Sequence, residues 1–190
     1  MPNNRGRIIS GELRKRIIKT PAEKEIRPTS DYLKESIFNV LEHEICISDT
    51  NTIDICAGSG ALGIEALSRG SRECVFIDNN KTAITCINEN AKKLGIHDRS
   101  FVIYSNASFI NEKILRFFKE ERELLIFIDP PYSDTDLLQS IVSNVRNIGK
   151  ICKKMIVIES GVSFELCPAP DEQVITKTYG KSKVSFLKRN

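Results

Sequence analysis

The stretch Thr52-Ile53-Asp54-Ile55-Cys56-Ala57-Gly58-Ser59-Gly60-Ala61-Leu62-Gly63 (residues 52–63) decides the fold of this 190-residue chain. Its first five residues are mostly apolar and predict a buried strand. The residues from Ala61 to Arg69 follow helical spacing and end at Gly70, a residue common just beyond helix ends. A strand that passes through a glycine-rich turn into a helix is typical of α/β proteins that bind a ligand at that turn.

Strand and helix patterns continue to alternate after this stretch, and the strands are apolar along their whole length. Such strands predict a parallel sheet that is covered on both faces. The end of the chain changes character and predicts an antiparallel hairpin around Tyr179-Gly180-Lys181. The predicted strands are Glu73–Ile77, Phe101–Tyr104, Leu124–Ile128, Met155–Glu159, Glu172–Lys177 and Lys183–Lys188, and the predicted helices are Lys81–Leu94, Ser108–Glu121 and Asp134–Ile148.

The residues before the alternating unit predict three further elements. Two short basic strands, Arg7–Arg14 and Lys15–Lys19, are expected around a Ser-Gly turn. Pro28 to Asp31 form a helix start signal, and apolar residues then recur at helical spacing from Leu33 to Ile45. We therefore divide the chain into a basic N-terminal β-extension, residues 1–27, and a Rossmann-like domain, residues 28–190.

The turn after the first strand of the alternating unit has the spacing Gly58-x-Gly60-x-x-Gly63, which allows a ligand to approach the backbone closely. Asp78 follows at the end of the next strand, where a carboxylate can accept hydrogen bonds from two ribose hydroxyls. Because NAD and S-adenosylmethionine share an adenosine, these residues alone predict either ligand.

Asp54 favours S-adenosylmethionine. A carboxylate inside this strand would repel a pyrophosphate, but it suits the ammonium group of a methionine moiety. Its alternative role is to cap nearby loop amides. Asn106 follows the third strand, where an adenine-reading group is expected, and its amide can donate and accept. The predicted cofactor site consists of Asp54, Ala57, Gly58, Ser59, Gly60, Asp78, Asn79, Asn106 and Ala107.

The fourth strand ends in Asp129-Pro130-Pro131-Tyr132, four residues that we predict to be catalytic. Two prolines impose a rigid, extended turn. The Asp129 carboxylate and the Pro130 carbonyl can accept the two N–H bonds of a planar amino group and favour the charge that develops on its nitrogen during methyl transfer. Tyr132 can stack on the planar substrate. Together with the glycine loop, this tetrapeptide predicts a class I S-adenosylmethionine-dependent methyltransferase, with no metal required.

Charge is distributed unevenly along the chain. Residues 1–27 carry a net charge of +5, residues 173–190 also carry +5, and residues 28–172 carry −7. Basic ends on an acidic body indicate contact with a polyanion, and the alternative is that both ends are solvated tails. No apolar run approaches the roughly 18 residues of a membrane span, and no signal peptide is evident, so we expect a cytoplasmic protein.

The chain has six cysteines, none in a Cys-x-x-Cys pair, and several fall in apolar strand patterns. We interpret them as buried, reduced thiols and expect no metal site.

These motifs together resemble the RsmD family of bacterial 16S rRNA guanine-N2 methyltransferases. The resemblance covers nearly the whole chain: residues 7–11, 27–31, 36–41, 54–70, 76–80 and 129–132. It implies methylation of the N2 of one guanine, position 966 in the usual rRNA numbering, in the small ribosomal subunit or its assembly particle. It also implies that rRNA phosphates contact Arg5, Arg7, Arg14, Lys15, Arg16, Lys19 and Arg27.

Two residues depart from the family's pattern. The family usually has an aromatic residue in place of Cys56 and Asp in place of Asn106. Three other functions stay open: another amino methyltransferase acting on adenine N6 or on protein glutamine, a nicotinamide oxidoreductase, and an rRNA-binding assembly factor without activity. The oxidoreductase leaves Asp129 to Tyr132 unexplained, and the intact tetrapeptide argues against an inactive factor.

Overall fold

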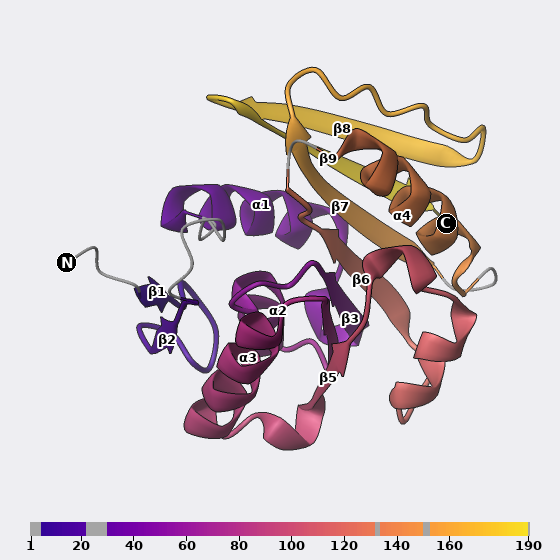
Figure 1. The fold of residues 1–190 in the computed structure, drawn as a ribbon. Coiled ribbons are helices and arrows are strands. Elements are labelled where there is room, and N and C mark those ends of the chain that lie inside the picture. The colour runs from indigo at the N-terminus through magenta and orange to yellow at the C-terminus, as the bar shows by residue number, and fades with distance from the viewer. Residues whose placement is uncertain (1–4, 22–29, 132–133, 150–152, 190) are drawn as a thin grey trace.

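The computed structural model describes residues 5–21, 30–131, 134–149 and 153–189 (Figure 1). Within them, one sheet has seven strands in the order β5-β4-β3-β6-β7-β9-β8, and a small second sheet pairs β1 with β2. The strands are β1 (Arg5–Arg7), β2 (Ile17–Lys19), β3 (Thr50–Ile55), β4 (Cys74–Asp78), β5 (Ser100–Tyr104), β6 (Glu123–Ile128), β7 (Lys154–Gly161), β8 (Glu172–Tyr179) and β9 (Ser182–Arg189).

The predicted mostly parallel sheet is confirmed. Strands β3 to β7 pair in parallel, and the C-terminal hairpin adds β9 antiparallel to β7, with β8 at the edge. The chain runs outward from β3 to β5 on one side and then returns to pair β6 against the other side of β3. Ligands of open α/β sheets bind where the strand order reverses, so β3 and β6 flank the expected site.

Helices cover both faces of this sheet, as its apolar strands require. One face packs against α1 (Asp31–Glu44), α2 (Ala61–Ser68) and α3 (Lys81–Leu94). The other face packs against α4 (Thr135–Asn147) and two 3₁₀ segments, η3 (Ala107–Phe109) and η4 (Glu112–Phe117). Two further 3₁₀ turns, η1 (Ile47–Asp49) and η2 (His97–Arg99), lead into β3 and β5.

Capping residues account for the helix starts. The Ser30 hydroxyl accepts a hydrogen bond from the Leu33 amide at 3.1 Å, which begins α1. The Asn80 side chain accepts from the Thr82 amide at 2.7 Å and begins α3. The predicted boundaries of α3 are therefore confirmed, and each predicted end of α2 and α4 lies within one residue of the observed end. The predicted start signal of α1 is confirmed by the Ser30 cap.

The single helix predicted over Ser108–Glu121 is wrong. The chain forms η3 and η4 there instead. The Asn111 side chain accepts from the Lys113 amide at 3.1 Å and begins a new turn, which interrupts a continuous helix. Only Ile110 and Ile114 of this stretch are fully buried against the sheet.

The boundaries predicted for the two N-terminal strands are also wrong, because only β1 and β2 pair. The loop between them docks on α2. The Ile9 and Ser10 amides donate to the Glu65 carboxylate at 2.8 and 2.9 Å. Gly11 has a φ of 81°, and a Cβ there would lie 1.8 Å from the Ser68 carbonyl oxygen. These backbone groups are therefore bonded to α2 and not to a partner strand.

The prediction of buried cysteines holds for Cys74 and Cys86 but is wrong for Cys46 and Cys167. Those two lie in connecting segments after α1 and before β8, and not in apolar strands. Cys152 lies outside the described residues.

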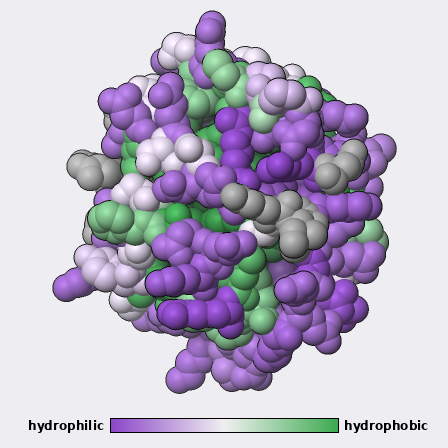
Figure 2. All heavy atoms as spheres, turned by 90° about the vertical axis from the view of Figure 1, so that its right-hand side faces the viewer, coloured by the Kyte–Doolittle hydropathy of each residue, from purple (hydrophilic) through white to green (hydrophobic). Residues whose placement is uncertain are grey.

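On the face drawn in Figure 2, most residues are hydrophilic, and hydrophobic residues gather near the centre. Among the described residues, no helix has the length and apolar character to span a membrane.

Candidate active site

A cavity of about 1140 Å³ opens at the carboxyl ends of the parallel strands. It extends from the β4 and β5 ends, past the β3 and β6 ends, to α1 and the β8–β9 hairpin. Of the predicted cofactor and catalytic residues, its lining includes Asp54, Ala57, Gly58, Ser59, Asp78, Asn79, Asn106, Ala107, Asp129, Pro130 and Pro131. The tertiary structure thus brings the two groups of predicted residues together at the point where the strand order reverses.

The glycine loop follows β3 in an unusual backbone conformation. Cys56, Gly58 and Gly60 have φ values of 61°, 54° and 77°, in the left-handed region that favours glycine. The Gly60 amide donates to the Ala57 carbonyl at 2.7 Å, which tightens the loop ahead of α2. Gly60 itself is the residue at which α2 begins, and it is buried and does not line the cavity.

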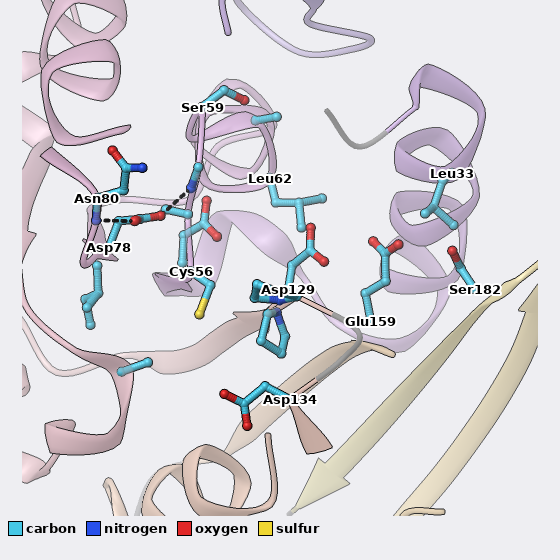
Figure 3. A pocket seen from close by; sticks show the side chains of 18 of the residues that line it. Leu33, Cys56, Ser59, Leu62, Asp78, Asn80, Asp129, Asp134, Glu159 and Ser182 are labelled. Carbon is cyan, nitrogen blue, oxygen red and sulfur yellow. Dashed lines mark hydrogen bonds between the residues drawn. The ribbon is translucent and has the colours of Figure 1, made fainter. Parts of the chain in front are cut away.

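Asp78 fixes the loop from the neighbouring strand. Its two carboxylate oxygens accept hydrogen bonds from the Gly58 amide and the Asn80 amide, both at 2.8 Å (Figure 3). Each carboxylate oxygen has a second acceptor site, so the group can still bind two hydroxyls. The same bonds orient the carboxylate before any ligand arrives.

Asp54 is only 2% exposed, and its carboxylate accepts from the Gly63 amide at 2.9 Å. The capping role considered for this residue is therefore present. Burial raises the pKa of Asp54 to about 7, and the Gly63 hydrogen bond opposes this shift. A cationic group entering the cavity beside Asp54 would favour its ionised form.

Asn106 begins η3 with its side-chain oxygen, which accepts from the Ser108 amide and the Ser108 hydroxyl, both at 2.9 Å. These bonds occupy both lone pairs of that oxygen. In this arrangement, the group that Asn106 can offer to an adenine ring is its NH2, a donor. An Asp at this position would offer an acceptor instead.

Asp129 lies directly after β6, next to the glycine loop. Its amide donates to the Ile55 carbonyl at 3.3 Å, which ties the tetrapeptide to the end of β3. The Asp129 side chain points into the cavity in Figure 3. Pro130 is buried, and the Pro131 carbonyl accepts from the Asp134 amide at 3.2 Å. Tyr132 lies outside the described residues.

The cavity can hold an extended adenosine-type ligand on its β4–β5 side and a planar substrate on its β6–β7 side. On the first side, the oriented Asp78 carboxylate and the exposed backbone of the glycine loop fit the ribose and methionine parts of S-adenosylmethionine. Asp54 lies beneath the same loop and provides a carboxylate suited to an ammonium group. Within the described residues, no cluster of three or more His, Cys, Asp or Glu side chains could hold a metal ion.

Several lining residues were not indicated by the motifs: Tyr32, Leu33, Glu159 and the hairpin residues 178–182. Glu159 could have been found, because it directly follows an apolar strand core, as Asp129 does. The hairpin residues could not, because they reach the cavity only when β9 pairs with β7.

The predicted RNA-binding residues are spread over the N-terminal extension. Arg7 pairs with Asp31 at 3.2 Å and Lys19 pairs with Glu89 at 2.7 Å, whereas Arg14, Lys15 and Arg16 are exposed on the loop between β1 and β2. Arg5 lies in β1, and Arg27 lies outside the described residues.

The chain is similar to known proteins over most of its length. Residues 6–188 match the family model described as "Conserved hypothetical protein 95". The chain is 30% identical to the "Ribosomal RNA small subunit methyltransferase D" of Escherichia coli (strain K12) over 176 residues, which cover 89% of this chain and 83% of that protein. It is 31% identical to the protein of the same name from Buchnera aphidicola subsp. Baizongia pistaciae, over 93% of this chain and 86% of that protein.

Among solved structures, the chain is similar to one titled "Putative methyltransferase yhhF from Escherichia coli". The two share 27% sequence identity and a TM-score of 0.78, and the match covers 98% of each chain.

Proposed function

We propose, from the premise that this chain belongs to the RsmD family, that it transfers a methyl group from S-adenosylmethionine to the exocyclic N2 of a guanine in small-subunit (16S) rRNA. The expected target is guanine 966, and the expected place is the cytoplasm. One observation supports this most strongly: Asp129 and Pro130 share one cavity with the Gly58 loop, across the β3–β6 reversal point.

The residues divide the work between the two sides of the cavity. Asp78 would hold the ribose hydroxyls, Asn106 and Ala107 the adenine, and Asp54 with the loop amides the methionine part. When bound, S-adenosylmethionine supplies an electrophilic methyl group on sulfur. Asp129 and the Pro130 carbonyl would accept the two N–H bonds of the guanine amino group and keep its nitrogen pointed at the cofactor side. The Asp129 carboxylate also opposes the positive charge that develops on that nitrogen.

The proton leaves the nitrogen after the new N–C bond forms, to Asp129 or to water. The rigid Pro130-Pro131 turn limits movement of these acceptors, because neither residue has an amide hydrogen or a variable φ. Tyr132 is proposed to stack on the base. We propose that residues 1–27 contact rRNA phosphates near the cavity while residues 28–190 carry out the transfer.

Tritiated S-adenosylmethionine tests the substrate. The protein is incubated separately with small ribosomal subunits lacking the modification, with 16S rRNA, with DNA and with protein acceptors. Label is expected in rRNA, free or within the subunit, and mapping should place it on the N2 of one guanine. Label found only in DNA or protein, or in none of the acceptors, would contradict the proposal.

Asp129→Ala tests the catalytic assignment. We expect the transfer rate to fall about 10²- to 10³-fold, because an acceptor aimed at the developing charge is lost. Cofactor affinity, measured by calorimetry, should change little, because Asp129 lies on the substrate side. A variant that instead loses cofactor binding would show that Asp129 belongs to the cofactor site.

A further inference from the structure

Glu159 lies one strand away from the catalytic tetrapeptide, at the same level of the sheet. Strands β6 and β7 pair in parallel with Ile128 opposite Ile158, so the next residues in this register are Asp129 and Glu159. Neighbouring strands lie about 4.8 Å apart, and paired residues of parallel strands point to the same face. Asp129 and Glu159 are therefore adjacent carboxylates at one end of the sheet.

Both side chains lie on the same face of the sheet as Phe127 and Val157, and this face packs against α1. Figure 3 shows the two carboxylates pointing into the same cavity, with Leu33 of α1 and Ser182 of β9 beyond Glu159. Glu159 is only 6% exposed. A planar group held by Asp129 would thus meet the Glu159 carboxylate on one edge and the apolar Leu33 side chain nearby.

Three other carboxylates of the cavity accept hydrogen bonds from backbone amides that shape its walls. Asp78 orients the glycine loop, Asp54 accepts from the Gly63 amide, and Asp134 begins α4 by accepting from the Leu137 amide at 2.9 Å. Asp129 and Glu159 are the two that lie side by side on the β6 and β7 ends, where the proposed function places the base.

A second hydrogen-bond acceptor beside the one that binds the amino group can discriminate between nucleobases. The amino group of guanine lies next to a ring N–H at N1, so two acceptors can bind this edge together. The amino groups of adenine and cytosine each lie next to a ring nitrogen with a lone pair. A carboxylate facing that lone pair would be repelled, and it would be left buried without the hydrogen bond that guanine provides.

We propose that Glu159 selects guanine by accepting a hydrogen bond from N1–H, while Asp129 holds the neighbouring N2 amino group. This inference rests on the proposed function and adds the residue that decides which base is accepted. Glu159 takes no part in the transfer itself: it contacts the base edge and aligns it, so its loss changes the choice of base more than it changes cofactor binding.

2-Aminopurine provides the test, because it keeps the 2-amino group but has a lone pair at N1. Small subunits are reconstituted with rRNA that carries guanine or 2-aminopurine at the position that the wild-type protein methylates, and kcat/KM is measured on each. The wild-type protein should prefer guanine by about 10- to 100-fold. Glu159→Gln places a donor opposite N1 and should reduce this preference at least about tenfold, by losing activity on guanine and gaining it on 2-aminopurine.

Glu165→Gln is the matched control, because it makes the same change at an exposed residue after β7 and should keep the wild-type preference. Glu159→Ala, with the carboxylate removed and no donor added, should lose activity on guanine without the gain on 2-aminopurine. Cofactor affinity should stay unchanged in all three variants, which shows that they fold.

The two proposals fail in different ways. If the wild-type protein methylates no guanine in the subunit, the proposed function is wrong. If it methylates guanine and Glu159→Gln keeps the wild-type ratio of guanine to 2-aminopurine, the function stands and the role of Glu159 is wrong.

Discussion

At the scale of single residues, the cavity depends on carboxylates whose surroundings differ sharply. Asp78 is partly exposed and held by two amides, whereas Asp54 is buried beneath the glycine loop with one. The pKa of Asp54 rises to about 7 because burial disfavours its charged form. One group in the proposed cofactor site should therefore change its charge near neutral pH.

Asp54 makes stability depend on pH with a definite sign. The pKa of Asp54 is raised from 3.8 to about 7, so between these two pH values the native state keeps a proton that the unfolded chain has lost. The stability that this proton contributes is lost as the pH rises through 7. Asp54→Asn removes the titration but keeps an oxygen for the Gly63 amide. Urea unfolding from pH 4 to 8 should show wild-type stability falling relative to the variant, by at most about 1.4 kcal/mol per pH unit. Parallel profiles would contradict this.

At the scale of elements, α2 joins the N-terminal extension to the sheet through a buried carboxylate. Glu65 has no exposed surface and accepts from the Ile9 and Ser10 amides and from the Arg69 guanidinium at 3.0 Å. The Lys34 ammonium of α1 lies 3.8 Å from the same carboxylate, and burial lowers the pKa of Lys34. Three segments thus depend on one side chain.

Glu65→Gln should lower the free energy of unfolding by about 3–5 kcal/mol, because it removes the buried carboxylate beside the Lys34 and Arg69 charges and points an NH2 group at amide donors. Urea denaturation measures the loss, and hydrogen exchange should show faster opening of residues 8–16. Glu42→Gln is the control: it removes the half-exposed partner of Arg69 and should cost less than about 1 kcal/mol. Equal losses in the two variants would argue against the anchoring role of Glu65.

At the scale of the whole molecule, basic residues of the N-terminal extension lie on the surface of the protein. The exposed residues Arg14, Lys15 and Arg16 lie on the extension, which Figure 1 places at the opposite end of the molecule from η4. If rRNA phosphates bind this extension, salt must weaken the complex through release of counterions.

Replacing Arg14, Lys15 and Arg16 with Ala should reduce the slope of log affinity against log salt concentration by about 2, at roughly 0.7 per phosphate contact. Binding to a 16S rRNA fragment is titrated between 50 and 200 mM KCl. The control replaces Lys113, Arg116 and Lys119 of the η4 region and should leave the slope near the wild-type value. A slope that responds equally to both triple variants would mean that the extension is not the RNA contact.

The sequence by itself determined the parallel sheet, the glycine loop and the positions of Asp78 and Asp129. Each of these depends on short-range pattern: an apolar strand, the residue that ends it, and the rule that carboxyl ends of parallel strands share one edge. Local pattern failed to predict the structure at two places. The Asn111 side chain accepts a backbone amide in the segment predicted as one helix. Residues of α2 accept hydrogen bonds from the amides of Ile9, Ser10, Glu12 and Leu13, which were predicted to lie in a strand.

Only the tertiary structure decided which residues line the proposed substrate side of the cavity. Glu159 meets Asp129 because β7 pairs beside β6 in one particular register, and Ser182 and Tyr179 join them because β9 folds back along β7. Leu33 arrives from α1, more than 90 residues earlier in the chain than Asp129. These neighbours are brought together by strand pairing and packing between distant segments, and a local stretch of sequence does not specify such long-range interactions. We propose that the choice of guanine depends on these contacts.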